Sequence, residues 1–192
     1  MHIAVFGGAF DPIHNGHCKI VDYLIEDPQF DRIAIVPTGT PVFHKEFMFS
    51  AAQRVNMLLK LYQDQPSVDI FDYETQKETP SYMIETLRYI QQTVDQAVLT
   101  LVIGYDQFMQ FHRWRYFEDI LSNHQLLIMN RKGVGDATIN NILPSELKLF
   151  EKSIQFSECD LPEVSSSLIR QMIQNGDVIE SLVPEVVSNE IS

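Results

Sequence analysis

Residues 7–17 read GGAFDPIHNGH and combine two adjacent glycines with two histidines three positions apart. Gly7 and Gly8 have no Cβ, so the backbone there can turn sharply and approach a bound molecule closely. The imidazoles of His14 and His17 supply groups that donate hydrogen bonds or carry positive charge. These residue types in this order are typical of a loop that binds phosphate and stabilises charge on it.

The elements on either side of this loop favour the same chemistry. Residues 3–6 form a short apolar run, which predicts a strand that ends at the glycines. Pro12 fixes its own φ and disfavours helix at Asp11, so the next helix is predicted to begin near Asn15 or Gly16. The unpaired N–H groups and the positive end of that helix dipole then point into the loop.

Strand and helix patterns alternate along the rest of the chain. Strands are predicted at 3–6, 32–37, 68–71, 98–103 and 125–130, with a weaker one at 153–156. Helices are predicted at 16–25, 51–62 and 82–94, with a shorter helical region over 105–121. Because the strands are almost entirely apolar, they indicate a parallel sheet buried on both faces. The predicted fold class is α/β, a Rossmann-like doubly wound parallel sheet with helices on both faces, which binds ligands at the carboxyl ends of its strands.

The C-terminal part of the chain predicts a small helical segment. Residues 164–174 form a helical pattern that has Ser165 or Ser166 at its start and Gly176 just past its end, and Pro184 opens a further short helix. No linker divides the chain, and 192 residues suit one domain. We therefore expect a single domain over 1–192, with residues 164–192 packed on it as C-terminal helices.

The overall charge limits the class of ligand. A net charge of −12 and a pI near 4.8 argue against nucleic acid as a partner, because a broad basic surface is missing. A small anionic ligand needs only a local cluster of cations. The candidates for that cluster are His14, His17, Lys45, Arg113, Arg115 and Arg170.

Other classes of site and location are disfavoured. Cys18 and Cys159 are too few and too far apart for a disulfide framework, so we expect two buried or half-buried thiols. No apolar run reaches about 18 residues and no signal peptide is evident, so we expect a cytoplasmic protein without membrane contact. The paired histidines would need further ligands to hold zinc, and none stands nearby in the sequence, so no metal site is predicted. A partial G-x-G at 131–135 is interpreted as a surface turn.

The segment GGAFDPIHNGH resembles the signature of the H-x-G-H nucleotidyltransferase superfamily, whose members transfer a nucleotidyl group and release pyrophosphate. Further segments, in order, resemble the nicotinate-nucleotide adenylyltransferases over nearly the whole chain. Residues 37–45, PTGTPVFHK, are similar to a family loop that ends in lysine, here Lys45, and are one residue longer. Residues 74–87 are similar to a motif centred on P-S-Y-T, with Met83 in place of the threonine.

Two later segments extend the resemblance. Gly104 and Asp106, with Trp114 downstream, are similar to the family's G-x-D and tryptophan, which contact ribose and stack on the nicotinate ring. Residues 164–170, VSSSLIR, are similar to a serine-rich helix start that binds phosphate, one turn before Arg170. Ser81 is predicted to be the N-cap of the helix whose start receives the nicotinate carboxylate.

The resemblance implies a role for each of these positions. The catalytic residues would be His14, His17, Lys45 and Arg170. ATP would be bound by Gly7, Gly8, Ala9, Phe10, Gly16, Gly104, Asp106, Ser165, Ser166 and Ser167. The acceptor would be bound by Ser81, Tyr82, Met83 and Trp114.

The implied reaction is adenylyl transfer from ATP to nicotinate mononucleotide, with Mg²⁺ accompanying the triphosphate and no dedicated protein cage for it. Three alternatives remain open: another acceptor, such as nicotinamide mononucleotide or phosphopantetheine; CTP as donor; or a non-catalytic nucleotide-binding regulatory module on the same fold. The resemblance also leaves a homo-oligomer open.

Overall fold

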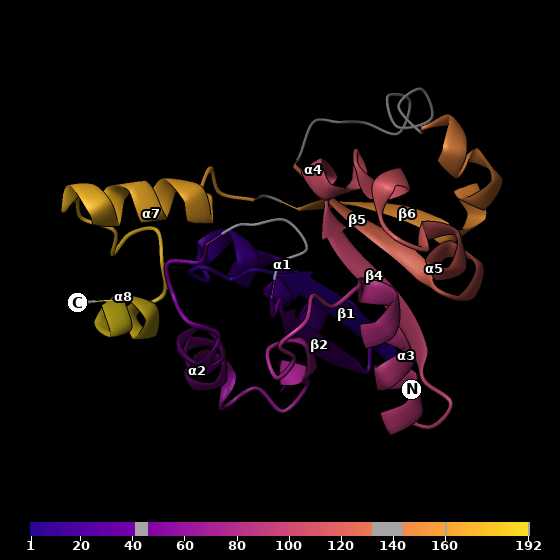
Figure 1. Cartoon of the computed structure of the whole chain (residues 1–192), viewed down its shortest axis with the longest axis horizontal. Coiled ribbons are helices and arrows are strands. Elements are labelled where there is room, and N and C mark those ends of the chain that lie inside the picture. The colour runs from indigo at the N-terminus through magenta and orange to yellow at the C-terminus, as the bar shows by residue number, and fades with distance from the viewer. Residues whose placement is uncertain (41–45, 132–143, 160, 192) are drawn as a thin grey trace.

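A computed structural model describes residues 1–40, 46–131, 144–159 and 161–191 (Figure 1). The described residues form one sheet of six parallel strands in the order β3-β2-β1-β4-β5-β6. The strands are β1 (His2–Gly8), β2 (Arg32–Pro37), β3 (Val68–Ile70), β4 (Val98–Gly104), β5 (Gln125–Arg131) and β6 (Ile154–Cys159). The predicted α/β fold class is confirmed.

The order in which strands are added to the sheet reverses at β1, which pairs with β2 on one side and β4 on the other. The connections after β1 and after β4 therefore run away from each other and leave a crevice at the carboxyl end of β1, where such sheets bind ligands. The loop 9–14 follows β1 directly and occupies this position.

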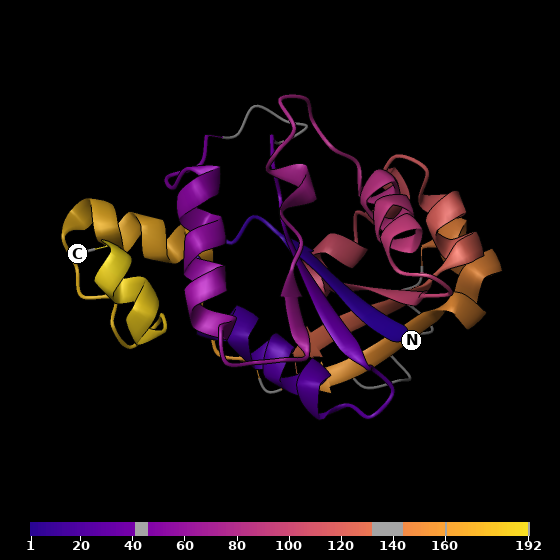
Figure 2. The ribbon, with the colours of Figure 1, turned by 90° about the horizontal axis from the view of Figure 1, so that it is seen from below.

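Two apolar layers cover the two faces of the sheet. Successive residues of β1 point to opposite faces and so belong to different layers. Ala4 and Phe6 pack with the helices α1 (Asn15–Glu26) and α2 (Ala51–Tyr62), whereas Ile3 and Val5 pack with α3 (Met83–Thr93) and α5 (Phe117–Asn123). Figure 2 shows the sheet between α2 and α3. Four short helices complete this part of the fold: α4 (Tyr105–Phe108) and the 3₁₀ helices η1 (Asp72–Glu74), η2 (Phe111–Arg113) and η3 (Ser145–Ser153).

The C-terminal helices α7 (Ser166–Asn175) and α8 (Glu185–Ile191) lie at one end of the molecule, beyond α2 (Figure 1). Ile169 of α7 and Val187 of α8 are fully buried in the same apolar layer as α1 and α2. Glu190 pairs with Lys60 of α2. Through these contacts both helices pack against the main body of the fold.

The helical region predicted over 105–121 is wrong as a single element. The chain there forms α4, η2 and α5 in succession, and Tyr116 interrupts it with a left-handed backbone, φ 60° and ψ 34°. Several aromatic residues in this segment must reach the core in turn, and Phe108 and Phe111 are both fully buried. Tertiary packing of these rings overrides the local helical pattern.

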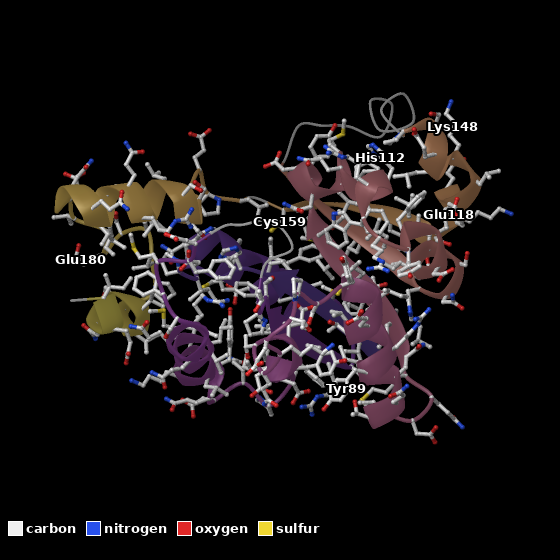
Figure 3. All side chains as sticks on the ribbon, viewed as in Figure 1. Tyr89, His112, Glu118, Lys148, Cys159 and Glu180 are labelled. Carbon is white, nitrogen blue, oxygen red and sulfur yellow. The ribbon has the colours of Figure 1, made fainter. Side chains whose placement is uncertain are left out.

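The two cysteines are thiols inside the fold, as predicted. Cys18 is half-buried, and burial raises the pKa of its thiol to about 11. Cys159 is buried near the middle of the molecule (Figure 3), and its Sγ lies 3.8 Å from the carbonyl of Lys19. Within the described ranges, no helix is both long and apolar enough to cross a bilayer.

Candidate functional site

The loop between β1 and α1 is held in one shape by Phe10. This residue has a left-handed backbone, φ 47°, and its ring is almost fully buried. The ring packs edge-on against Phe6, with centroids 5.5 Å apart, and against His17, at 5.0 Å. A Cβ on Gly8 would meet the Phe10 ring at 3.0 Å, so glycine lets the backbone lie directly against this aromatic anchor.

His14 and His17 together cap the N-terminus of α1. The backbone N–H groups of Gly16 and His17 donate to Nδ1 of His14, at 3.1 and 3.4 Å, while the N–H of His14 donates to Nδ1 of His17, at 3.3 Å. This is a capping box built from imidazoles instead of hydroxyl and carboxylate groups. The rings stack with centroids 3.7 Å apart. Helix α1 begins at Asn15, as predicted.

This geometry sets the protonation of both rings. Each Nδ1 accepts backbone hydrogen bonds, so in the neutral imidazole the proton resides on Nε2, which becomes a donor. Burial lowers the pKa of His14 to about 4. Burial lowers the pKa of His17 well below its usual value, and the adjacent His14 lowers it further. The sequence interpretation counted both residues as cations, whereas these lowered pKa values make them neutral Nε2–H donors near pH 7.

The start of α7 lies against this loop. Ser165 is the N-cap of α7 and accepts from the N–H of Leu168 at 3.2 Å, as predicted. Ser166 Oγ donates to the carbonyl of Pro12 at 3.0 Å. A Cβ on Gly16 would meet Val164 at 3.3 Å and the His14 ring at 3.0 Å, so glycine permits this close packing. Two helix N-termini thus converge beside the histidines, which suits an anion.

Arg170 is the predicted cation of α7, and the structure connects it to the same loop. Its Nη1 donates to the carbonyl of Asp11 at 2.8 Å and lies 3.5 Å from Asp11 Oδ2. Its Nη2 donates to Ser167 Oγ at 3.0 Å. The guanidinium therefore joins the serine-rich start of α7 to the turn before His14.

Asp11 and Arg54 are site residues that the sequence interpretation missed. The carboxylate of Asp11 is completely buried and accepts from the N–H groups of Met48 and Phe49, at 3.1 and 2.9 Å. Arg54 is also buried, and it donates to the carbonyls of Ala9 at 2.7 Å and Phe49 at 3.3 Å. These two side chains fasten the loop 9–14 to the start of α2.

The start of α3 differs from the prediction. The N-cap is Tyr82, not Ser81, and no side chain caps this helix. Ser81 Oγ is buried without a hydrogen-bond partner among the described residues. The Met83 side chain lies over the end of β1, because a Cβ on Gly7 would stand 2.5 Å from its Cε. The first turn of α3, where the acceptor is expected, thus lies next to the end of β1, from which the loop 9–14 continues.

The end of β4 carries the remaining predicted residues. Gly104 ends the strand and caps α4, and a Cβ there would meet nothing within 4 Å. Asp106 is exposed in the first turn of α4. Trp114 is half-buried and packs on Phe111, with ring centroids 5.1 Å apart. Figure 3 shows His112, close to Trp114 in the chain, at the same end of the molecule as α4.

A second buried cluster, also missed from the sequence, joins the loop after β2 to α3. Thr86 Oγ1 donates to Glu74 Oε1 at 2.6 Å, and Glu74 is 4% exposed. Burial raises the pKa of Glu74. A Cβ on Gly39 would stand 1.9 Å from the Glu74 carbonyl oxygen, so only glycine fits there.

Two other predictions meet the limits of the described residues. Lys45 lies outside the described residues. So does the turn at 131–135, except for its first residue. Within them, no group of three or more histidine, cysteine or acidic side chains is placed to hold a metal ion.

Comparison with known proteins identifies the family of the chain. Residues 5–172 match the cytidylyltransferase-like family. A protein of Clostridium tetani named probable nicotinate-nucleotide adenylyltransferase is 33% identical over 98% of this chain and 94% of its own length. A protein of the same name from Legionella pneumophila is 30% identical over 100% of this chain and 97% of its own length.

A solved structure has the same fold. It is the nicotinic acid mononucleotide adenylyltransferase of Plasmodium falciparum complexed with NaAD, which is 17% identical, with a TM-score of 0.76 over 99% of this chain and 94% of that one. Its sequence similarity is low, so this match supports the architecture alone. The sequence relatives carry the assignment. The chain belongs to the cytidylyltransferase-like family and, within it, to the nicotinate-nucleotide adenylyltransferases.

Proposed function

We propose that the protein transfers the adenylyl group of ATP to nicotinate mononucleotide and gives deamido-NAD and pyrophosphate. An oxygen of the 5′-phosphate of nicotinate mononucleotide attacks the α-phosphorus of ATP and forms a new P–O bond. The bond from that phosphorus to the bridging oxygen of pyrophosphate breaks, and its electron pair leaves with pyrophosphate. No covalent intermediate on the protein is needed.

The observation that carries this proposal is the histidine pair at the start of α1. His14 and His17 stack at 3.7 Å and keep both Nδ1 atoms occupied by backbone N–H groups. Their Nε2–H groups are then fixed donors for phosphate oxygens. Transfer of a phosphoryl-type group depends on positioning and on stabilising charge at the equatorial and leaving oxygens, which fixed donors supply without reorganisation.

The neighbouring elements supply the rest of a triphosphate site. Helix α7 brings Ser165, Ser166 and Ser167 to the same loop, and Arg170 lies one turn further on. Lys45 remains the predicted second point charge on phosphate. At the end of β4, Asp106 is proposed to contact the ribose of ATP. Gly104 is proposed to let the backbone approach ATP closely. ATP enters as its magnesium complex, whose metal is held by phosphate oxygens and water.

Adjacency in the fold supports the proposed position of the acceptor. Met83 lies over Gly7, so a mononucleotide with its ring near Tyr82 and Trp114 has its 5′-phosphate directed toward the loop of His14. Tyr82, the N-cap of α3, makes no side-chain cap, so the first N–H groups of that helix remain available to donate to a ligand. Both substrates then meet at the carboxyl end of β1.

The proposal is tested by pyrophosphate release from purified protein. ATP or CTP is combined with nicotinate mononucleotide, nicotinamide mononucleotide or phosphopantetheine, each with Mg²⁺, and the dinucleotide product is identified by chromatography. We expect turnover with ATP and nicotinate mononucleotide, far above every other pair. Turnover only with a different pair would overturn the proposed substrates, and nucleotide binding by calorimetry without any turnover would favour a regulatory module.

A further inference from the structure

Arg115 places a cation against the start of α3. Its guanidinium carbon lies 4.7 Å from the centroid of the Tyr82 ring and 5.0 Å from that of Tyr116. Its Nη2 also donates to the Tyr116 hydroxyl at 3.3 Å. Tyr82 is the N-cap of α3, and Arg115 directly follows Trp114 in the chain. The cation therefore joins the two segments proposed to bind the acceptor ring.

The charge of Arg115 is not neutralised by its neighbours. Within the described part of the chain, its guanidinium contacts two tyrosine side chains rather than carboxylates. The nearest acidic positions in sequence are Glu118 and Asp119, in the first turn of α5, and Asp119 lies 3.5 Å from Arg88. Because the chain has a net charge of −12, a guanidinium that contacts tyrosines rather than carboxylates is a distinct local positive charge. It can accept an anion without first giving up an ion pair.

The two rings hold the guanidinium in place. Arginine stacks on aromatic faces while its N–H groups remain able to donate, so the side chain is oriented before a ligand arrives. Tyr116 is set by its left-handed backbone, φ 60°, at the turn into α5. A residue other than glycine rarely adopts this conformation, and the ring of this tyrosine lies against the Arg115 guanidinium.

Nicotinate carries a carboxylate where nicotinamide carries a carboxamide, and the two rings are otherwise the same. A guanidinium fork matches a carboxylate in shape and charge but gains far less from a neutral amide, which also presents its own N–H donors. We propose that Arg115 binds the carboxylate of the nicotinate ring and thereby selects nicotinate mononucleotide over nicotinamide mononucleotide. This inference rests on the proposed function.

The test compares both acceptors in steady-state kinetics, with ATP saturating. In Arg115→Ala we expect KM for nicotinate mononucleotide to rise about tenfold, the effect of one charge-assisted hydrogen bond, with kcat and KM for ATP little changed. KM for nicotinamide mononucleotide stays the same, so the preference between acceptors falls by the same factor. Arg115→Lys keeps the charge without the fork and recovers part of the preference.

Arg88→Ala is the matched control, because it removes another exposed arginine, one that already lies 3.5 Å from the carboxylate of Asp119. We expect it to leave the preference unchanged. An equal effect of Arg88→Ala and Arg115→Ala, or an equal change with both acceptors, would overturn the role of Arg115 and leave the proposed function standing. Wild-type protein that is inactive with nicotinate mononucleotide would overturn both.

Discussion

His14 is expected to be neutral at physiological pH and to donate from Nε2. With a pKa of about 4, about one molecule in a thousand carries a protonated His14 at pH 7, compared with about one in four at the ordinary pKa near 6.5. The cause is burial, since the residue is 7% exposed. Its Nδ1 accepts from two backbone N–H groups, which leaves the proton of the neutral ring on Nε2. His17, stacked on it, shifts in the same direction.

Nitrogen-15 NMR of protein labelled at histidine measures this directly, because ring nitrogen shifts distinguish the two neutral tautomers from imidazolium. Between pH 5.5 and 8 we expect both residues to remain in the Nε2–H form. Titration of either ring near pH 6.5, or a proton on Nδ1, would refute the reasoning from the capping geometry.

The same shift predicts how stability depends on pH. The folded pKa of His14 lies below its unfolded value, so between about pH 6.5 and 4 the unfolded chain binds more protons than the folded protein. This contribution to stability is present above pH 6.5 and is lost as pH falls, on the order of 3 kcal/mol when complete. Urea unfolding of wild type and His14→Asn, whose side chain also caps helices but stays neutral, isolates it. Parallel pH profiles of the two proteins would contradict the prediction.

Three further changes test other parts of the site. His17→Ala should leave a folded protein whose turnover is lower by about 10²–10³, the usual cost of losing one fixed donor, and near-native turnover would remove this histidine from the mechanism. Arg54→Met should lower the free energy of unfolding in urea by roughly 2–4 kcal/mol, because the carbonyls of Ala9 and Phe49 lose their buried donors, and a loss below 1 kcal/mol would contradict this. Gly39→Ala should lower Tm clearly while Gly104→Ala does not, since an added Cβ meets a backbone oxygen at 1.9 Å in the first case and open space in the second; equal Tm values would refute the clash.

The sheet was predictable because its strands are buried on both faces. Residues such as those of β1 and β4 form nearly unbroken apolar runs, and the connecting helices carry an apolar face with polar residues opposite. The start of α1 was predictable as well, since Pro12 and the glycines restrict the backbone locally. Each of these signals lies within a few residues of the feature that it predicts.

The missed residues have partners far away in the chain. Asp11 is bound by backbone N–H groups 37 and 38 positions later, and Arg54 binds a carbonyl 45 positions earlier. One signal for Arg54 was available: it stands three and four positions before Met57 and Leu58, on the buried face of α2. A charged residue on that face requires a buried partner. The sequence does not identify which partner that is.

In the proposed reaction, neutral histidines account for triphosphate binding by an acidic protein. Two imidazolium rings 3.7 Å apart would repel each other, and the repulsion would be strongest inside the fold, where screening is weak. Rings that stay neutral avoid this cost and still offer Nε2–H donors. When phosphate arrives, its negative charge favours protonation of the same rings. Positive charge is then available at the moment when negative charge develops on the leaving pyrophosphate, without being maintained beforehand.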